Sequence, residues 1–177
     1  MRSRISSSNG FSLAETVIAL GVLTTGVLGA AGVFVTGMRN LSSAPGDIVS
    51  AQKAAQAIEA VYSARDSGKL TWAQIKNVSN GGVFLDGAKP LKLPGPDGLV
   101  NTADDTTVES ITVPGKDQLF GTADDTVVTY STFTRQIAIT DVSGENGDLR
   151  KIVVTITYQN GSSTKTYTLT TYISSFA

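Results

Sequence analysis

The apolar positions of the chain are concentrated at its N-terminal end. From Thr16 to Met38, 23 consecutive residues carry no charge, and most of them are apolar. As a helix, at ~1.5 Å per residue, this run spans about 34 Å and is long enough to cross the ~30 Å hydrocarbon core of a bilayer. The pattern therefore predicts a membrane-spanning helix near the N-terminus.

A second run with helical spacing follows. Polar residues separate its apolar positions, so we expect an amphipathic helix that packs through one apolar stripe. The predicted stripe consists of Ile48, Ala51, Ala55, Ile58 and Tyr62. A short helical turn with Trp72 and Ile75 pointing inward is expected after it.

The stretch between the two runs, residues 42–46, contains Pro45 and Gly46. Proline removes a backbone donor and disfavours helical geometry in the residue before it. We therefore expect the helix to be interrupted or kinked there, with Asp47 as the N-cap of the second half.

The hydrophobic period changes to two from about Gly81 onward, and Thr, Val, Ile and Tyr become enriched. Strands are predicted over residues 127–140, 149–159 and 164–174, the last two joined by a hairpin turn at Asn160-Gly161-Ser162-Ser163. In the middle strand, alternation leaves one apolar face that the amphipathic helix can cover. Its members are Ile152, Val154, Ile156 and Tyr158. The predicted fold class is α+β: a long N-terminal helix, first apolar and then amphipathic, packed on a C-terminal antiparallel sheet.

The composition excludes several classes of function. The chain has no histidine and no cysteine, which excludes Ser-His-Asp and Cys-His catalysis, His or Cys metal sites and disulfides. No serine or lysine lies in a recognisable nucleophile motif, so we expect no enzymatic activity. A formal net charge of −1 argues against a nucleic-acid partner, which would require clustered Lys and Arg.

The first ten residues contain Arg2 and Arg4 and no acidic residue. Because basic residues mark the cytoplasmic end of a membrane helix, we expect the N-terminus in the cytoplasm and the globular part on the far side. A cleaved secretory signal peptide and a plain signal anchor are the alternatives. Five glycines within the apolar run favour close packing against other helices.

The segment Gly10-Phe11-Ser12-Leu13-Ala14-Glu15 opens the apolar helix. Through it, about 40 residues of the chain resemble the type IV pilin superfamily. Members of that family carry a short basic leader ending in glycine, a phenylalanine or methionine at the mature N-terminus, and a glutamate five residues into the mature chain. The run from Ala19 to Gly29 is most similar to minor pilins of the PilV type.

The resemblance implies a role for each of these residues. A prepilin peptidase/methyltransferase is expected to cut between Gly10 and Phe11 and to methylate the new amine of Phe11. Glu15 is then expected to meet this amine on a neighbouring subunit during filament assembly. A carboxylate at the bilayer centre costs about 2.5–3.5 kcal/mol on insertion scales, so Glu15 needs either a partner or a place at the interface. A place at the cytoplasmic headgroups without any partner is the alternative.

A second motif is duplicated within the chain. Residues 95–106 recur twenty residues later as residues 115–126, with eight of twelve positions identical. Between Pro94 and Thr126 there are seven acidic residues and one lysine. Carboxylates crowded into glycine-containing loops repel one another unless a cation neutralises them, and Ca²⁺ binds roughly six to eight such oxygens.

We therefore predict that the duplicated loops bind Ca²⁺, in one site per copy or in one shared cluster. The predicted ligands are Asp97, Asn101, Asp104, Asp105, Asp117, Asp124 and Asp125. The spacing differs from that of an EF-hand, because the closing glutamate and the alternating acids are missing. Turn formation by aspartate without a metal is the alternative.

Three parts are thus expected: a leader (1–10), an apolar helix (11–40) and an exported globular domain (41–177). The predicted function is a structural subunit of a type IV pilus or related filament, held in the inner membrane before assembly and extracellular afterwards. Its expected partners are other pilin subunits and the processing enzyme. A pseudopilin in a periplasmic pseudopilus of a type II secretion system is one alternative. A signal-anchored or secreted calcium-binding adhesion module is the other.

Overall fold

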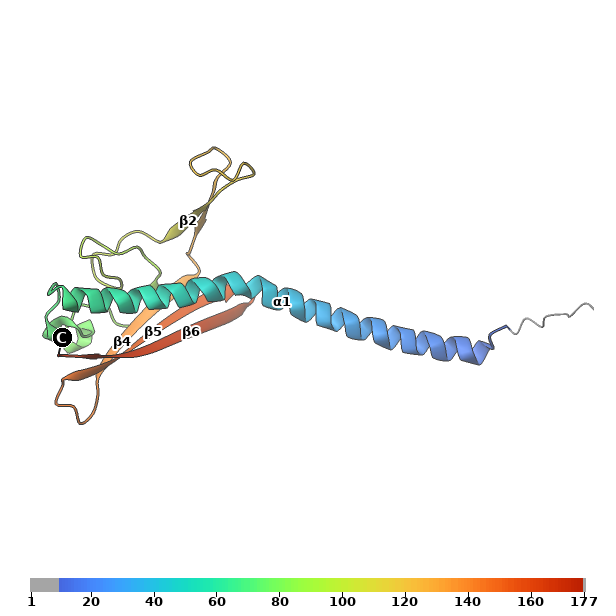
Figure 1. Ribbon diagram of the computed structural model, residues 1–177, viewed down its shortest axis with the longest axis horizontal. Helices are drawn as coiled ribbons and strands as arrows, with labels where there is room; N and C mark the ends of the chain where they lie inside the picture. Colours follow the sequence, from blue (N-terminus) through green and yellow to red (C-terminus); the bar gives the residue numbers. More distant parts are fainter. Residues whose placement is uncertain (1–9, 177) are drawn as a thin grey trace, which may run out of the picture. The chain divides into compact units, whose positions relative to one another are not determined.

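The computed structural model describes residues 10–176, apart from the side chains of Arg39, Asn40, Ser42 and Ser43. The chain divides into two compact units, Met1–Ser43 and Ala44–Ala177. Both contain part of the long helix α1 (Leu13–Asp66) (Figure 1). The predicted leader lies outside the described residues up to Asn9.

The first unit contains the apolar part of α1. Residues Leu13–Met38 form a 26-residue helical stretch with a mean hydropathy of 2.1. All of their side chains are exposed. Length and composition suffice to cross a membrane, so the expectation of an apolar N-terminal helix that could anchor the protein is confirmed.

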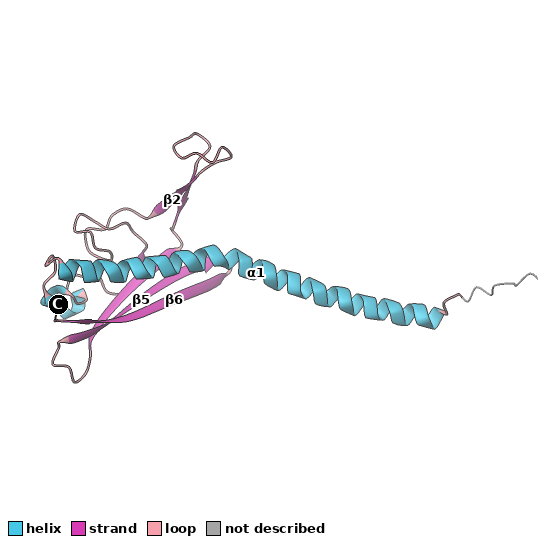
Figure 2. Ribbon diagram, viewed as in Figure 1, coloured by secondary structure: helices cyan, strands magenta, loops and turns pink. Residues whose placement is uncertain are grey.

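The second unit contains an antiparallel sheet in the order β1-β4-β5-β6 and a separate two-stranded sheet of β2 and β3 (Figure 2). The strands are β1 (Lys89–Pro90), β2 (Ser110–Val113), β3 (Thr126–Thr129), β4 (Phe133–Asp141), β5 (Leu149–Asn160) and β6 (Ser163–Ser174). Two 3-10 turns, η1 (Trp72–Gln74) and η2 (Val78–Asn80), follow α1. The predicted α+β class is confirmed.

The β5–β6 hairpin agrees with the sequence, and its turn places Gly161 at a φ of 61°, which favours glycine. The single strand expected over residues 127–140 is wrong. The chain turns between β3 and β4, where the N–H of Phe133 donates to the carbonyl of Tyr130 (3.1 Å). The two rings pack edge to face, with centroids 5.3 Å apart, so aromatic packing at the turn overrides the continuous β pattern.

The second half of α1 covers the inner face of the sheet. The helix contributes small buried side chains at helical spacing, Ala54, Ala57, Val61 and Ala64. They pack in one core with sheet residues that include the predicted face: Ile137, Ile139, Ile152, Val154, Ile156 and Tyr158. The predicted helix stripe was wrong at Ile48 and Ala55, which are exposed, and right at Ile58 and Tyr62, which are partly buried against this core. Small side chains let the helix lie close to the sheet, whereas the larger ones are left at the margin.

The expected interruption at residues 42–46 does not occur, because α1 continues through Pro45. Asp47 is therefore inside the helix and is not an N-cap. Its carboxylate instead accepts a hydrogen bond from the Tyr158 hydroxyl (2.7 Å). Gly46 makes room for the same tyrosine, since a Cβ there would lie 2.3 Å from the Tyr158 ring. These contacts stabilise a helical turn that Pro45 alone would weaken. Burial and the neighbouring Asp47 carboxylate raise the pKa of Tyr158 to about 12.

Candidate functional site

The start of α1 is the first candidate site. Gly10, Phe11 and Ser12 precede the helix. The hydroxyl of Ser12 accepts the backbone N–H of Glu15 (3.2 Å), so Ser12 is the N-cap. The sequence reasoning missed this residue, although Ser-x-x-Glu before an apolar run is a known capping pattern.

The peptide bond predicted to be cut, between Gly10 and Phe11, therefore lies outside the helix. The Phe11 side chain is 86% exposed. Glu15 is exposed in the first helical turn, where the positive end of the helix dipole favours a carboxylate. The geometry leaves both the bond and the carboxylate accessible to other molecules.

The duplicated loops are the second candidate site, named here loop A (95–106) and loop B (115–126). They share one set of hydrogen bonds. In loop A the Asp105 carboxylate accepts the N–H groups of Asn101 (2.7 Å) and Thr102 (3.3 Å). In loop B the Asp125 carboxylate accepts those of Gly121 (2.6 Å) and Thr122 (3.3 Å). The repeated sequence therefore gives a repeated local structure.

A second pair of aspartates has the same role in both copies. Asp104 accepts the Thr102 hydroxyl at 2.7 Å, and Asp124 accepts the Thr122 hydroxyl at 2.8 Å. The hydrogen bonds from the threonine hydroxyls contribute most to the lowered pKa of Asp104 and of Asp124. The first glycine of each loop is also explained, because a Cβ at Gly95 or Gly115 would lie 2.4 or 2.1 Å from the carboxylate carbon of Asp104 or Asp124.

The third pair, Asp97 and Asp117, closes the first turn of each loop. Asp97 accepts the N–H of Leu99 (2.8 Å), and Asp117 accepts that of Leu119 (3.0 Å). All six aspartates of the predicted calcium sites thus accept hydrogen bonds from their own loop.

The two loops differ in what surrounds them. Loop A is docked on the core: Leu99 is 3% exposed, and the Asn101 side chain exchanges hydrogen bonds with Arg135 (Nε to Oδ1, 2.9 Å; Nδ2 to the carbonyl, 3.0 Å). Burial lowers the pKa of Arg135 to about 10. Loop B has no such anchor in the described structure, and its Leu119 and Phe120 are 62% and 70% exposed.

Calcium binding stays a prediction. Within residues 10–176, no three acidic side chains are gathered in an arrangement that could hold a metal ion. The carboxylate oxygens face backbone N–H groups and threonine hydroxyls instead. These contacts are the ones expected from the alternative, in which aspartates shape the turns.

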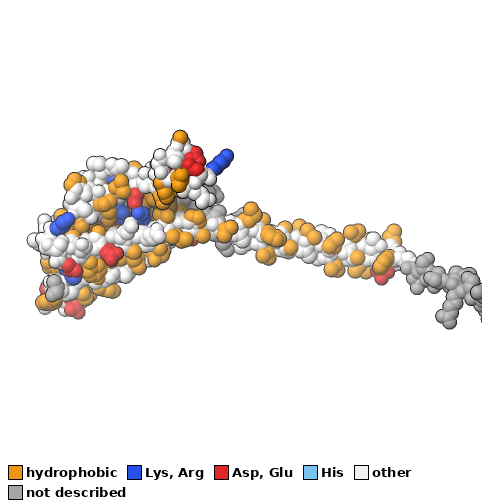
Figure 3. All heavy atoms as spheres, turned by 45° about the horizontal axis from the view of Figure 1, so that its top comes forward, with side chains coloured by type: hydrophobic (Ala, Val, Ile, Leu, Met, Phe, Trp, Pro, Cys, Tyr) orange, Lys and Arg blue, Asp and Glu red, His pale blue; other side chains and the backbone are white. Residues whose placement is uncertain are grey.

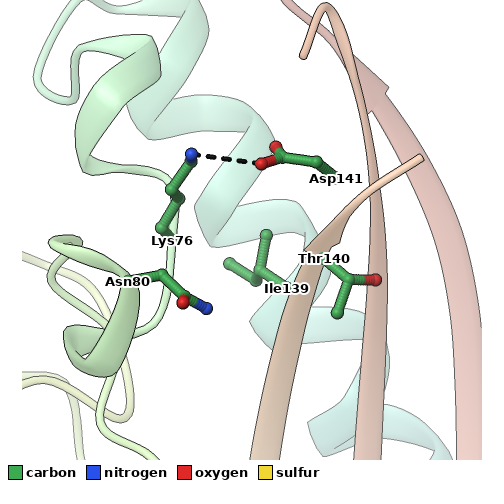
Figure 4. A pocket seen from close by; sticks show the side chains of 5 residues that line it. All are labelled: Lys76, Asn80, Ile139, Thr140 and Asp141. Atoms are coloured by element: carbon green, nitrogen blue, oxygen red, sulfur yellow. Dashed lines mark hydrogen bonds and ion pairs between the residues drawn. The ribbon is translucent and has the colours of Figure 1, made fainter. Parts of the chain in front are cut away.

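A polar hollow of about 290 Å³ lies elsewhere in the globular unit, lined by Lys76, Asn80, Ile139, Thr140 and Asp141 (Figure 4). Lys76 reaches across it to Asp141 (3.1 Å), and the buried Arg150 donates to the same carboxylate (2.8 Å). The hydrogen bond from Arg150 lowers the pKa of Asp141. Arg150 also lies over the Trp72 ring at 4.0 Å. Lys76 and Asp141 of the hollow thus pair with each other, and Arg150, which also donates to the carbonyl of Trp72, joins η1 to the sheet.

Comparisons with protein-family models, with curated proteins and with solved structures found no match for this chain.

Proposed function

We propose that the chain is a structural subunit of a type IV pilus or a related filament, most similar to a minor pilin. The observation that carries the proposal is the exposed apolar helix Leu13–Met38, headed by Glu15. An apolar surface of this extent requires a non-aqueous partner. A bilayer supplies one before assembly, and the helices of other subunits supply one afterwards.

Glu15 is the residue through which we expect the helix to be drawn from the bilayer into the filament. Its carboxylate lies in the first helical turn with no basic partner among the described residues. Cleavage before Phe11 creates a positive amine close to the N-terminus of the same helix. Because the amine of one subunit and the carboxylate of another attract strongly where water is excluded, pairing between copies would favour assembly.

The globular unit supports this function by folding around its own core. Its buried apolar residues come from the second half of α1, the 3-10 turns and the sheet. The unit therefore does not need the apolar segment for its hydrophobic core. Such independence suits a subunit whose N-terminal helix exchanges lipid for protein surroundings.

The test uses a variant that blocks processing without disturbing the fold. A Cβ added at Gly10 meets no atom within 4 Å, so Gly10→Val should affect only recognition by the peptidase. We expect the variant to stay unprocessed in the inner membrane and to be absent from filaments sheared off the cell surface. Gly21→Ala, which is equally unhindered, serves as the matched control and should be processed.

The location of the processed chain separates the alternatives. Recovery in sheared surface filaments supports the pilus, whereas processed subunits found only in the periplasm would favour a pseudopilus. A chain released without its apolar helix would favour a secreted adhesion module and contradict the proposal.

A further inference from the structure

One element of the globular unit extends away from the core. Residues 110–129, here called the arm, consist of β2, β3 and the loop that joins them (Figure 1). The two strands pair with each other in a sheet of their own, and all of their residues are exposed. A two-stranded ribbon is marginally stable in water unless one of its faces packs against something.

The arm carries apolar side chains in an ordered arrangement. Ile111 pairs with Val128, and Val113 lies two residues further along the same face. These three are 43–48% exposed. At the tip, Leu119 and Phe120 are more exposed than any of them. In loop A the equivalent Leu99 is buried, so the chain itself shows that this type of loop can dock through its apolar residues.

The base of the arm is fixed at one end of the globular unit. Tyr130 donates its N–H to the carbonyl of Glu109 (2.9 Å), and Glu109 forms an ion pair with Lys53 of α1. The Tyr130 ring packs on Phe133, which stacks on Tyr158. Since Tyr158 in turn bonds Asp47, the arm starts where the chain enters this unit from the apolar segment.

A second copy of the chain offers a surface that matches the arm. Among the described residues outside the arm, large exposed apolar side chains occur singly after residue 48 but continuously along the apolar part of α1. Loop B has three aspartates and one lysine, and acidic and apolar side chains share the end of the arm (Figure 3). Arg39 is the one charged residue between Thr16 and Gly46. An anionic lipid surface would repel these aspartates.

We propose that the arm docks on the apolar helix of a second copy, around Phe34 to Leu41, with Leu119 and Phe120 as its anchors. The contact is heterologous, because arm and helix are different surfaces, and it therefore repeats from copy to copy. The proposal rests on the proposed function only in that membrane or filament brings the copies side by side.

The test is cross-linking of full-length chains, which contain no native cysteine. Phe120→Cys is combined with Phe34→Cys, Met38→Cys or Leu41→Cys, and each double variant is treated with a short bis-maleimide. Both sheared filaments and vesicles containing only this chain are used. We expect a ladder of multimers from at least one double variant, whereas each single variant stays free of a ladder. Ser143→Cys with Met38→Cys is the matched control, since Ser143 is exposed in the turn at the other end of β4.

The outcomes separate the docking proposal from the filament proposal. Incorporation into filaments without any ladder overturns the arm contact and leaves the filament function standing. A ladder in vesicles with no incorporation supports the arm contact and contradicts the filament function. If no ladder forms and lipid shields the thiol introduced by Phe120→Cys from a water-soluble reagent, the arm binds the membrane, and the proposal is wrong.

Discussion

The apolar segment of α1 and the globular unit differ in where their side chains find partners. Along Leu13–Met38 every side chain is exposed, including large ones such as Phe34. In the globular unit the helix buries small side chains such as Ala57, and the buried Arg135 and Arg150 are hydrogen-bonded within the unit. One half of the helix thus packs inside the chain, whereas the other half is exposed.

This difference determines which property of the protein a substitution should change. A change in the apolar segment should alter insertion or assembly and leave the unfolding of the globular unit as it was. A change in the globular unit should alter its unfolding and leave insertion and assembly as they were. Unfolding is measured on the full chain in detergent micelles.

The largest effect is expected at Glu15. Glu15→Val should insert into the membrane at least as well as the wild type, because a charge is removed from an apolar helix. Losing one member of a desolvated ion pair costs about 3–5 kcal/mol, so incorporation into filaments should fall by about a hundredfold or more. Quantitative blotting of sheared filaments measures it, with Glu59→Val on the same helix as the control. Normal incorporation of Glu15→Val would rule out the amine pairing.

The second-largest effect is expected from a larger side chain at the contact between the helix and the sheet. Ala57 is fully buried, so Ala57→Leu should lower the free energy of unfolding by about 3 kcal/mol. Ala31→Leu makes the same change on the exposed apolar segment and should leave the denaturation midpoint unchanged. Equal destabilisation by both variants would contradict the division of the helix.

Calcium, if it binds, acts on the globular unit and is expected to distinguish the two loops. Both loops hold their aspartates with the same turn hydrogen bonds, but Asp105 of loop A is buried, whereas Asp117 and Asp124 of loop B are exposed to an ion in solution. At free calcium a hundredfold above Kd, linkage adds about 2.7 kcal/mol per site. Asp124→Ala should abolish the resulting rise in Tm, and Asp104→Ala should preserve it. A Tm that ignores both calcium and chelator would leave the aspartates with turn formation alone.

The docking of loop A can be tested against loop B at one equivalent position. Asn101 has a φ of 63° and bonds Arg135, whereas Gly121 has a φ of 85° and no side chain. Asn101→Gly keeps the backbone freedom but leaves buried polar groups unpaired, which should cost about 2 kcal/mol of unfolding free energy. The reverse change, Gly121→Asn, should cost less, about 1 kcal/mol, since asparagine is among the few residues that adopt a positive φ. Similar losses from both would mean that loop A is not anchored through this side chain.

The smallest expected effect is the loss of stability at low pH. The folded pKa values of Asp104 and Asp124 are lowered from 3.8, so their contribution to stability is present above that pH and is lost as the pH falls through the folded values. Thr102→Val and Thr122→Val remove the hydroxyl donors and should raise the pKa of the neighbouring carboxyl. Carboxyl-carbon NMR titration measures both. Unchanged titration in the threonine variants would refute the assigned cause.

The sequence predicted those parts of the fold whose period is long and regular. The apolar helix, the β5–β6 hairpin and the inward face of β5 all followed from spacing. The prediction that Ile48 and Ala55 face the core failed because hydrophobic spacing does not show how closely the helix approaches the sheet. At this close approach the small residues Ala54 and Ala57 are the ones buried. The single strand predicted over residues 127–140 failed because the contact between the Tyr130 and Phe133 rings accompanies a turn there.

At the candidate sites, the sequence indicated which residues matter but not all of the contacts that they make. The duplication indicated two equal loops, and local hydrogen bonding is indeed repeated. Their opposite burial depends on Asn101 meeting Arg135, a contact between residues far apart in the chain, which spacing does not predict. Ser12, by contrast, was available from its capping pattern before the apolar run.

The proposed filament function depends most directly on the N-terminus of the assembled protein. Filaments sheared from the cell surface are digested, and the N-terminal peptide is analysed by mass spectrometry. We expect this peptide to begin at Phe11, to carry a methyl group on its amine and to include Glu15. A mature N-terminus beyond Gly29, or a chain in the filaments that still begins at Met1, would contradict it.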